Sequence, residues 1–336
     1  MIGLFAIGCV FLAVGCTPSD TETTPTDTPT ATDTTTTPTL GEMQTIDNLD
    51  GITVSGDSGT EPTVDSAYPF NVTKTLCKTL IEGTGAEVGD SSILDTQYVG
   101  INASTGETFD SSWSRGQSMV GQMGGSWIAG WDICLKGQKD GGRVLMAITG
   151  ADGYDDMIAQ GQDPGAGISS GDTLVFVVDI LAVEYTGPQG QHLADGNQWA
   201  TVTDKDGIPT VSLIPGTTAP TDLQVNVLIQ GTGRPVLASD LFVGDFIQID
   251  FATGKEIDNS FTDGSPSPYA MLANLIPGLR TAIEGQPLGS RLLVIVPGAQ
   301  AYPAGNATPS VSPNATLVFL IDILFSCDPA SLPSSS

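Results

Sequence analysis

The chain has few basic residues and almost no histidine. Its 336 residues contain 11 Lys and Arg against 38 Asp and Glu, which gives a formal net charge of −27, and a single histidine, His192. A surface this negative repels phosphate groups, so the composition excludes a nucleic-acid-binding protein. One histidine supports neither a histidine-based catalytic triad nor a histidine metal site. We therefore expect no bound metal.

Long apolar runs are also missing. Only residues 2–15 are almost continuously apolar, and they fall short of the roughly 20 residues that a membrane-spanning helix needs. Their length suits the core of a signal peptide. The run ends Ala13-Val14-Gly15-Cys16, which resembles a bacterial lipobox, where cleavage precedes the cysteine and its sulfur receives a diacylglycerol. We expect residues 1–15 to be a signal peptide and Cys16 to carry a lipid anchor; a plain secretory signal or a short membrane anchor are the alternatives.

The segment that follows is poor in apolar residues. Residues 16–43 consist mainly of Thr, Pro, Asp and Ser, and between Thr17 and Asp65 there are ten Asp or Glu and no Lys or Arg. Such a segment cannot bury enough apolar surface to offset the entropy cost of ordering. We therefore expect a disordered tether between the lipid and the folded part.

The rest of the chain contains an internal repeat. Motifs recur at an offset of 148 residues and, near the end, of 143, as 80–85 with 228–233, 105–113 with 253–261, and 173–176 with 316–319. A repeat of this kind predicts two copies of one domain in tandem. We place them at 44–186, including a lead-in strand, and at 187–327, followed by a tail at 328–336.

Within the first copy the pattern is mainly that of β-strands. Apolar, β-branched runs bounded by glycine occur at 72–82, 92–101, 143–149 and 172–184. Ile128, Trp131 and Leu135 recur at helical spacing, which predicts one short helix over 128–136. We therefore predict an α+β fold, in which each copy has an antiparallel β-sheet wrapped around one short α-helix.

An ordered series of short motifs in the first copy resembles the FKBP-type peptidyl-prolyl cis-trans isomerases. The series is Gln97-Tyr98-Val99-Gly100, Phe109-Asp110-Ser111-Ser112, Arg115-Gly116, Trp127-Ile128-Ala129-Gly130-Trp131, Gly137-Gln138-Lys139, Gly153-Tyr154 and Thr173-Leu174-Val175-Phe176. No single motif is specific, but their order and spacing are. The resemblance implies two tandem FKBP-like domains and an enzyme that acts on proline-containing polypeptides without a cofactor.

The resemblance also implies a substrate pocket in the first copy. Trp131 would form the floor under the substrate proline, and the backbone N–H of Ile128 and the hydroxyl of Tyr154 would bind substrate carbonyls. Asp110 would either take part electrostatically or orient a neighbouring hydroxyl. The other walls would be Tyr98, Phe109, Met119, Trp127 and Phe176.

The chemistry of X–Pro isomerisation suits these residue types. Amide resonance gives the bond a rotational barrier of about 18–20 kcal/mol, and no covalent bond has to break. A dry apolar pocket disfavours the polar planar amide relative to the twisted state. Hydrogen bonds that strengthen only in the twisted geometry add to this effect. The reaction therefore requires neither a nucleophile nor a metal.

The second copy is divergent at the equivalent positions. Phe246 replaces Tyr98, and Leu279 replaces Trp131. The residues of its pocket would be Phe246, Asp258, Leu275, Ile276, Leu279, Tyr302 and Phe319. This copy would turn over substrate, bind polypeptide weakly or act as a spacer.

Three cysteines remain in the folded part of the chain. Cys77 and Cys134 occur only in the first copy, and Cys327 lies near the carboxyl end. In an exported protein, two cysteines private to one domain indicate either a disulfide or a pair of buried thiols.

Together these features predict a monomeric bacterial lipoprotein held outside the cytoplasm at the cell membrane. Its first domain would accelerate X–Pro isomerisation during the folding of exported proteins. The alternatives are a non-catalytic polypeptide-binding chaperone and a surface interaction protein that reuses the fold.

Overall fold

The computed structural model describes residues 42–263 and 270–332. The predicted signal peptide, the lipidation site at Cys16 and nearly all of the predicted tether lie outside these ranges. Within them, no helix has both the length and the apolar character that are needed to cross a membrane.

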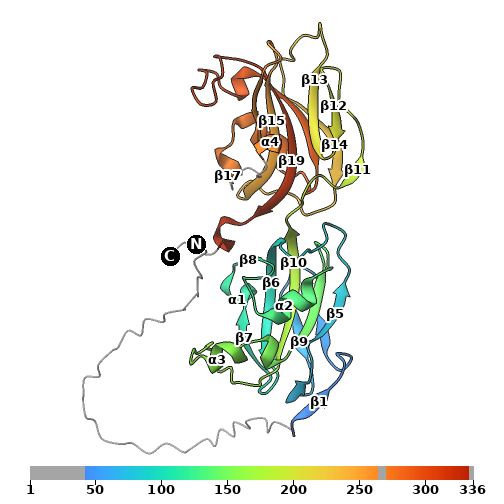
Figure 1. Ribbon diagram of the computed structural model, residues 1–336, viewed down its shortest axis with the longest axis vertical. Coiled ribbons are helices and arrows are strands. Elements are labelled where there is room, and N and C mark those ends of the chain that lie inside the picture. Colours follow the sequence, from blue (N-terminus) through green and yellow to red (C-terminus); the bar gives the residue numbers. More distant parts are fainter. Residues whose placement is uncertain (1–41, 264–269, 333–336) are drawn as a thin grey trace, which may run out of the picture. The chain divides into compact units, whose positions relative to one another are not determined.

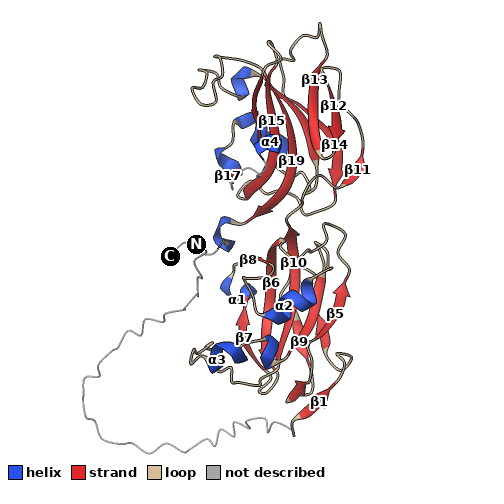
Figure 2. Ribbon diagram, in the orientation of Figure 1, coloured by secondary structure: helices blue, strands red, loops and turns tan. Residues whose placement is uncertain are grey.

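The predicted first domain, residues 44–186, contains a six-stranded antiparallel sheet (Figures 1 and 2). The strands follow the order β5-β9-β10-β6-β7, and β8 pairs with β6. The central strands β9 and β10 are buried almost throughout, which accounts for their continuous apolar sequences. The strands are β5 (Leu76–Ile81), β6 (Ile93–Asn102), β7 (Glu107–Ser111), β8 (Met119–Gln122), β9 (Arg143–Ile148) and β10 (Leu174–Val183).

The single strand predicted over residues 72–82 is interrupted at residues 73–75, because Val72 ends β4 and only Leu76–Ile81 forms β5. β4 (Phe70–Val72) pairs in parallel with β1 (Gln44–Ile46), whereas β5 pairs with β9. The chain thus changes partner between Val72 and Leu76, and a run of apolar and β-branched residues carries no signal for such a change. The other three predicted strands correspond to β6, β9 and β10.

Helix α2 (Ala129–Leu135) packs on β9 and β5 and corresponds to the predicted helix (Figure 1). Gly130 allows this close approach, because a Cβ atom there would lie 2.3 Å from the side chain of Ile148. The domain also contains short helices that the sequence did not predict, namely α1 (Ser112–Arg115), the 3₁₀ turn η1 (Gly150–Asp152) and α3 (Asp155–Ala159).

The lead-in to the first domain forms a layer of its own rather than one strand. It contains β1, the hairpin of β2 (Thr53–Ser55) with β3 (Thr63–Asp65), and β4. Its buried residues Leu49, Ile52 and Phe70 pack on alternate residues of β6, β9 and β10. Side chains of a strand alternate between faces. The lead-in therefore covers the sheet face opposite α2.

The predicted second domain, residues 187–327, repeats this plan with a seven-stranded sheet. Its strand order is β11-β14-β18-β19-β15-β16, with β17 paired to β15, and the hairpin β12–β13 packs over the sheet as the first lead-in does. The strands are β11 (Gly190–His192), β12 (Ala200–Lys205), β13 (Ile208–Leu213), β14 (Gln224–Gly231), β15 (Leu241–Asp250), β16 (Glu256–Asn259), β17 (Ala270–Met271), β18 (Arg291–Val296) and β19 (Leu317–Cys327). The helices are α4 (Ser260–Asp263), η2 (Leu272–Asn274), α5 (Pro277–Ile283) and η3 (Gly298–Gln300), and η4 (Pro329–Ser331) follows in the tail.

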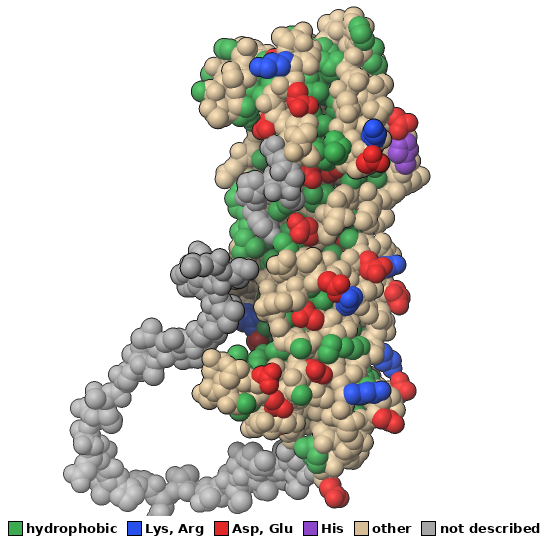
Figure 3. Space-filling view, in the orientation of Figure 1, with side chains coloured by type: hydrophobic (Ala, Val, Ile, Leu, Met, Phe, Trp, Pro, Cys, Tyr) green, Lys and Arg blue, Asp and Glu red, His purple; other side chains and the backbone are tan. Residues whose placement is uncertain are grey.

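The charges fall into a buried group and a surface group. Each sheet carries a buried ion pair, Arg143 with Asp179 (Nη2 to Oδ2, 2.8 Å) and Arg291 with Asp322 (2.7 Å). On the face drawn in Figure 3, Asp and Glu side chains are scattered and form no single patch. On this face the acidic side chains therefore mark no particular binding site.

Candidate functional site

Aromatic rings from one helix and two strands of the first domain meet around Trp131. This indole lies on α2 and is only 2% exposed. The rings of Tyr98 on β6 and Phe176 on β10 meet it edge to face, with centroids 5.2 and 5.5 Å away. Trp127, just before α2, lies 5.5 Å away at a smaller angle. This packing buries the indole and holds it in one orientation among apolar side chains.

Phe109 extends the aromatic group on β7. Its ring meets Phe176 edge to face at a centroid distance of 5.5 Å. Gly100 on β6 makes this possible, because a Cβ atom there would come within 2.6 Å of the Phe109 ring and 2.9 Å of the Phe176 ring. Met119, a predicted wall residue, and Ile128, whose backbone N–H was predicted to bind substrate, are partly buried against the same core.

A polar network lies on one side of the aromatic group. The hydroxyl of Tyr98 donates a hydrogen bond to Asp110 on β7. Arg115, at the end of α1, forms an ion pair with Asp110, donates to the Tyr98 hydroxyl from 2.9 Å, and places its guanidinium 5.4 Å from the Tyr98 ring centroid. Burial, and then the adjacent Asp110 carboxylate, raise the pKa of Tyr98. The hydroxyl therefore stays protonated and is held in one orientation.

Arg115 was not assigned a role from the sequence, although Arg115-Gly116 is part of the motif series. One-turn helix α1 brings it back toward Asp110. Ser111 caps this helix by accepting from the N–H of Ser114 at 3.2 Å, and Gly116 ends it in a left-handed conformation with φ of 67°. The residues that bend the chain here, Ser111 and Gly116, form a local turn and no hydrophobic period. The sequence therefore gave no indication that Arg115 contacts Asp110.

Tyr154 and Ile128 lie at the two positions that the resemblance gave to hydrogen-bond donors. Tyr154 follows η1. Its pKa is raised, mainly by burial and also by the negative charge of Asp110, which interacts with Tyr98 as well. The Tyr154 hydroxyl is therefore protonated. Ile128 is the N-cap residue of α2 and has extended backbone angles. The N–H of an N-cap residue is not used by the helix itself. Both residues are partly buried against the core cluster that contains Trp131.

In the second domain the equivalent residues pack together without such a polar network. The apolar residues, Phe246, Leu275, Ile276, Leu279, Tyr302 and Phe319, all belong to the packed core or lie against it. Asp258 accepts a hydrogen bond from the backbone N–H of Asn259 at 2.9 Å. Because Phe246 has no hydroxyl, it cannot bind Asp258 as Tyr98 binds Asp110.

Cys77 on β5 and Cys134 on α2 form a disulfide with a Cα–Cα distance of 5.3 Å. Cys327, on the last strand of the second domain, is a buried free thiol. Across residues 42–263 and 270–332, no three His, Cys, Asp or Glu side chains are grouped so that they could hold a metal ion.

Comparison with known proteins places these features in a family. The sequence model of the FKBP-type peptidyl-prolyl cis-trans isomerases matches residues 85–181 and 242–324. The FK506-binding protein of Streptomyces anulatus is 38% identical over 126 residues, 37% of this chain and 91% of that protein. The probable FK506-binding protein of Corynebacterium glutamicum is 38% identical over 103 residues, 31% of this chain and 81% of that protein.

Among solved structures, the crystal structure of FkpA from Escherichia coli is similar over 34% of this chain and 53% of its own, with 31% identity and a TM-score of 0.30. The two segments matched by the family cover more than half of the 336 residues, one in each copy of the repeat. The chain belongs to the family of FKBP-type peptidyl-prolyl cis-trans isomerases.

Proposed function

We propose that the first domain is the catalytic domain and that it accelerates X–Pro isomerisation in exported polypeptides. The observation that carries this proposal is the position of Trp131, whose indole is walled edge-on by Tyr98 and Phe176. A proline ring bound beside this aromatic group gains apolar contact without needing any covalent chemistry.

Each part of the site has a role in lowering the rotational barrier. The aromatic walls exclude water around the X–Pro bond and so disfavour the polar planar amide. The N–H of Ile128 and the hydroxyl of Tyr154 bind carbonyl groups on either side of the bond and hold the chain while it rotates. Asp110, held by Arg115, fixes the Tyr98 hydroxyl and places a negative charge beside the twisting amide.

The second domain is proposed to bind polypeptide without useful turnover. Leu279 gives a smaller and less rigid floor than Trp131, and Phe246 leaves Asp258 without a hydroxyl partner. Apolar side chains of a client would still find an apolar surface there. This arrangement would let the second domain retain a chain while the first domain acts on it.

Catalysis by the first domain is tested with a protease-coupled assay on an Ala-X-Pro-Phe peptide, using the full chain. We expect Trp131→Leu to lower kcat/KM by at least about tenfold, because it removes the rigid floor. The matched control, Leu279→Ala in the second domain, should leave kcat/KM unchanged. A Trp131→Leu chain as active as the parent would overturn the proposal. Suppression of client aggregation that survives Trp131→Leu would assign the chaperone activity to another surface.

The proposed location is the outer side of the membrane, with a lipid on Cys16. Two observations support it, the lipobox-like sequence and the disulfide, which is characteristic of an oxidising compartment. Metabolic labelling with a radioactive fatty acid should mark the parent and not Cys16→Ser. A parent without label would overturn the lipid anchor and leave a plain secreted or membrane-inserted form, and label that persists in Cys16→Ser would overturn Cys16 as its site.

A further inference from the structure

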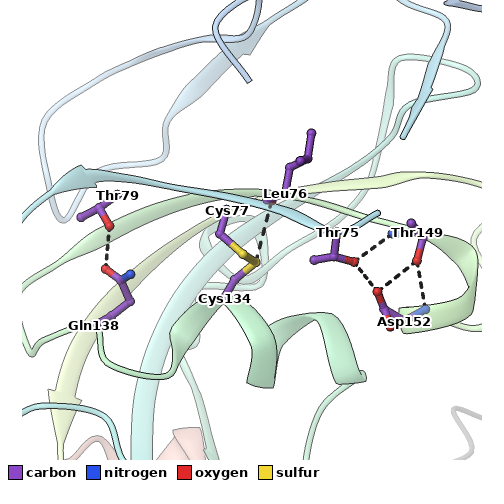
Figure 4. The surroundings of a disulfide bond; sticks show 8 residues. All are labelled: Thr75, Leu76, Cys77, Thr79, Cys134, Gln138, Thr149 and Asp152. Atoms are coloured by element: carbon purple, nitrogen blue, oxygen red, sulfur yellow. Dashed lines mark hydrogen bonds between the residues drawn. A yellow bond between two sulfur atoms is a disulfide. The ribbon is translucent and has the colours of Figure 1, made fainter. Parts of the chain in front are cut away.

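The edge strand β5 of the first domain presents a row of three side chains toward α2. Thr75 directly precedes β5, and Cys77 and Thr79 lie within it. Alternate residues of a strand share one face, and Figure 4 shows Thr75, Cys77 and Thr79 on the side of α2 while Leu76 points away. Leu76 and Leu80 pack instead on the lead-in cluster. We call Thr75, Cys77 and Thr79 the β5 row.

Two members of the β5 row hold α2 and the residues that follow it. Cys77 forms the disulfide with Cys134, which is three residues after Trp131 on the same helix. The hydroxyl of Thr79 donates to the side-chain oxygen of Gln138, just beyond the end of α2, at 2.9 Å (Figure 4). Helix α2 has seven residues and no side-chain cap at Ile128. So short a helix depends on such outside contacts for its position.

The third member holds the turn that carries Tyr154. Thr75 donates from its hydroxyl to Oδ2 of Asp152 at 2.6 Å, and Thr149 donates to the same oxygen at 3.1 Å. The backbone N–H of Thr149 in turn donates to the Thr75 hydroxyl at 3.3 Å. Asp152 is the last residue of η1, two residues before Tyr154. The turn that leads into Tyr154 is therefore tied to β5.

The second domain lacks every one of these links. At the offset of 148 residues the β5 row becomes Leu223, Val225 and Val227, and its partners Cys134, Thr149 and Asp152 become Ala282, Pro297 and Gln300. None of these side chains can form the disulfide or the Thr–Asp hydrogen bond. The same domain has also lost Trp131 and the Tyr98 hydroxyl, so the links and the site are absent together.

We propose that Thr75, Cys77 and Thr79 are positioning residues for the reaction. From one rigid strand they set the separation between α2, which carries Ile128 and Trp131, and the turn that carries Tyr154. The substrate must contact both segments at once, so this separation determines how well its carbonyl groups are held while the bond rotates. The inference rests on the proposed catalytic role of the first domain.

A double-mutant cycle on the full chain tests the link to Tyr154. We expect Thr75→Val to lower kcat/KM about fivefold, because a small misplacement of a positioned group is costly. Thr75→Ser, which keeps the hydroxyl, should retain the parent value. In a Tyr154→Phe background Thr75→Val should cause no further loss, since the hydroxyl that it positions is already gone. A general loss of structure would instead add its effect in both backgrounds.

The disulfide provides a second measurement that does not depend on the folding of Thr75→Val. Dithiothreitol should lower the parent kcat/KM to the value of the Cys77→Ala/Cys134→Ala variant and leave that variant unchanged, with near-UV circular dichroism as the check on folding. Two results would overturn this inference while the parent remains active. One is an unchanged kcat/KM in both Thr75→Val and the reduced parent. The other is an equal loss from Thr75→Val in the parent and in the Tyr154→Phe background. A parent without activity would overturn the proposed function, and this inference with it.

Discussion

The hydroxyl of Tyr98 donates a hydrogen bond to the carboxylate of Asp110. At the same place the second domain has Phe246 and Asp258, so the carboxylate is kept and its hydroxyl partner is lost. This pair is a polar difference between the two copies, whereas most other positions in the pockets are unchanged or exchange one apolar residue for another.

The first prediction concerns this hydroxyl. Tyr98→Phe keeps the ring packed on Trp131 but removes one hydrogen bond to a charged partner, and we expect kcat/KM to fall about fivefold, as the loss of about 1 kcal/mol would cause. The protease-coupled assay measures it. The matched change in the other copy, Phe246→Tyr, should give no gain in the full chain. A Tyr98→Phe chain with the parent's kcat/KM would show that the hydroxyl has no part in catalysis.

The second prediction concerns the pH dependence of stability. Burial raises the pKa of Asp140 to about 7 and that of Asp95 to about 6; the Tyr185 hydroxyl and Arg234 offset the shift of Asp140 only in part. Both values lie above the unfolded value of about 3.9, so the folded chain binds more protons than the unfolded chain between these limits. The free energy of unfolding should therefore fall as the pH rises from about 4 to about 7.

Urea denaturation at pH 5 and pH 8 checks this sign. The contribution of Asp95 and Asp140 should give the parent a lower urea midpoint at pH 8 than at pH 5. Asp140→Asn can still accept a hydrogen bond but carries no buried charge, so it should be more stable than the parent at pH 8, by about 3 kcal/mol, and have a smaller advantage at pH 5. An advantage of the same size at both pH values would contradict the prediction.

The third prediction concerns the buried ion pair Arg143–Asp179, whose two side chains are each 2% exposed. Arg143 also donates to the backbone oxygens of Gly56 and Thr60 in the lead-in, at 2.8 and 3.1 Å. Asp179→Ala leaves the guanidinium buried and unpaired, and we expect a loss of about 3–5 kcal/mol in the free energy of unfolding.

Chemical denaturation with a surface pair as control tests this third prediction. Lys78→Ala breaks the exposed pair with Asp50 and should cost less than about 1 kcal/mol. If Asp179→Ala cost no more than Lys78→Ala, the lead-in would not depend on the ion pair for its attachment to the sheet.

The fourth prediction concerns Cys327. Burial, ahead of the nearby carboxylates of Asp95 and others, raises the pKa of its thiol to about 12. Since the thiolate is the reactive form, iodoacetamide should leave Cys327 unmodified in the native chain at pH 8 and modify it after denaturation. Peptide mapping by mass spectrometry gives the result directly, and modification of the native protein would show that the last strand opens.

Much of the fold was predictable because the repeat marks both domains and the central strands are continuously apolar. The aromatic group was predictable as well, since Tyr98, Trp131 and Phe176 occupy recognisable motifs, and the structure brings their rings together. The change of strand between Val72 and Leu76 was not, because strand partners are decided by tertiary contacts and not by local sequence.

Two features of the site also needed the structure. The sequence left open whether Cys77 and Cys134 are joined, because it gives no distance between a strand and a helix that are 57 residues apart. Arg115 stood in a motif without a role, since only the turn of α1 brings it to Asp110. Contacts of this kind depend on how loops return to the sheet, which hydrophobic patterns do not specify.

Exchange NMR on a short X–Pro peptide, without protease, tests the central claim most directly, because it measures cis–trans interconversion itself. The full chain, Trp131→Leu and Leu279→Ala would each be added at catalytic concentration. We expect fast exchange with the parent and with Leu279→Ala, and exchange at least about tenfold slower with Trp131→Leu, approaching the uncatalysed time of tens of seconds. Fast exchange with Trp131→Leu, or its loss with Leu279→Ala, would contradict the assignment of catalysis to the first domain.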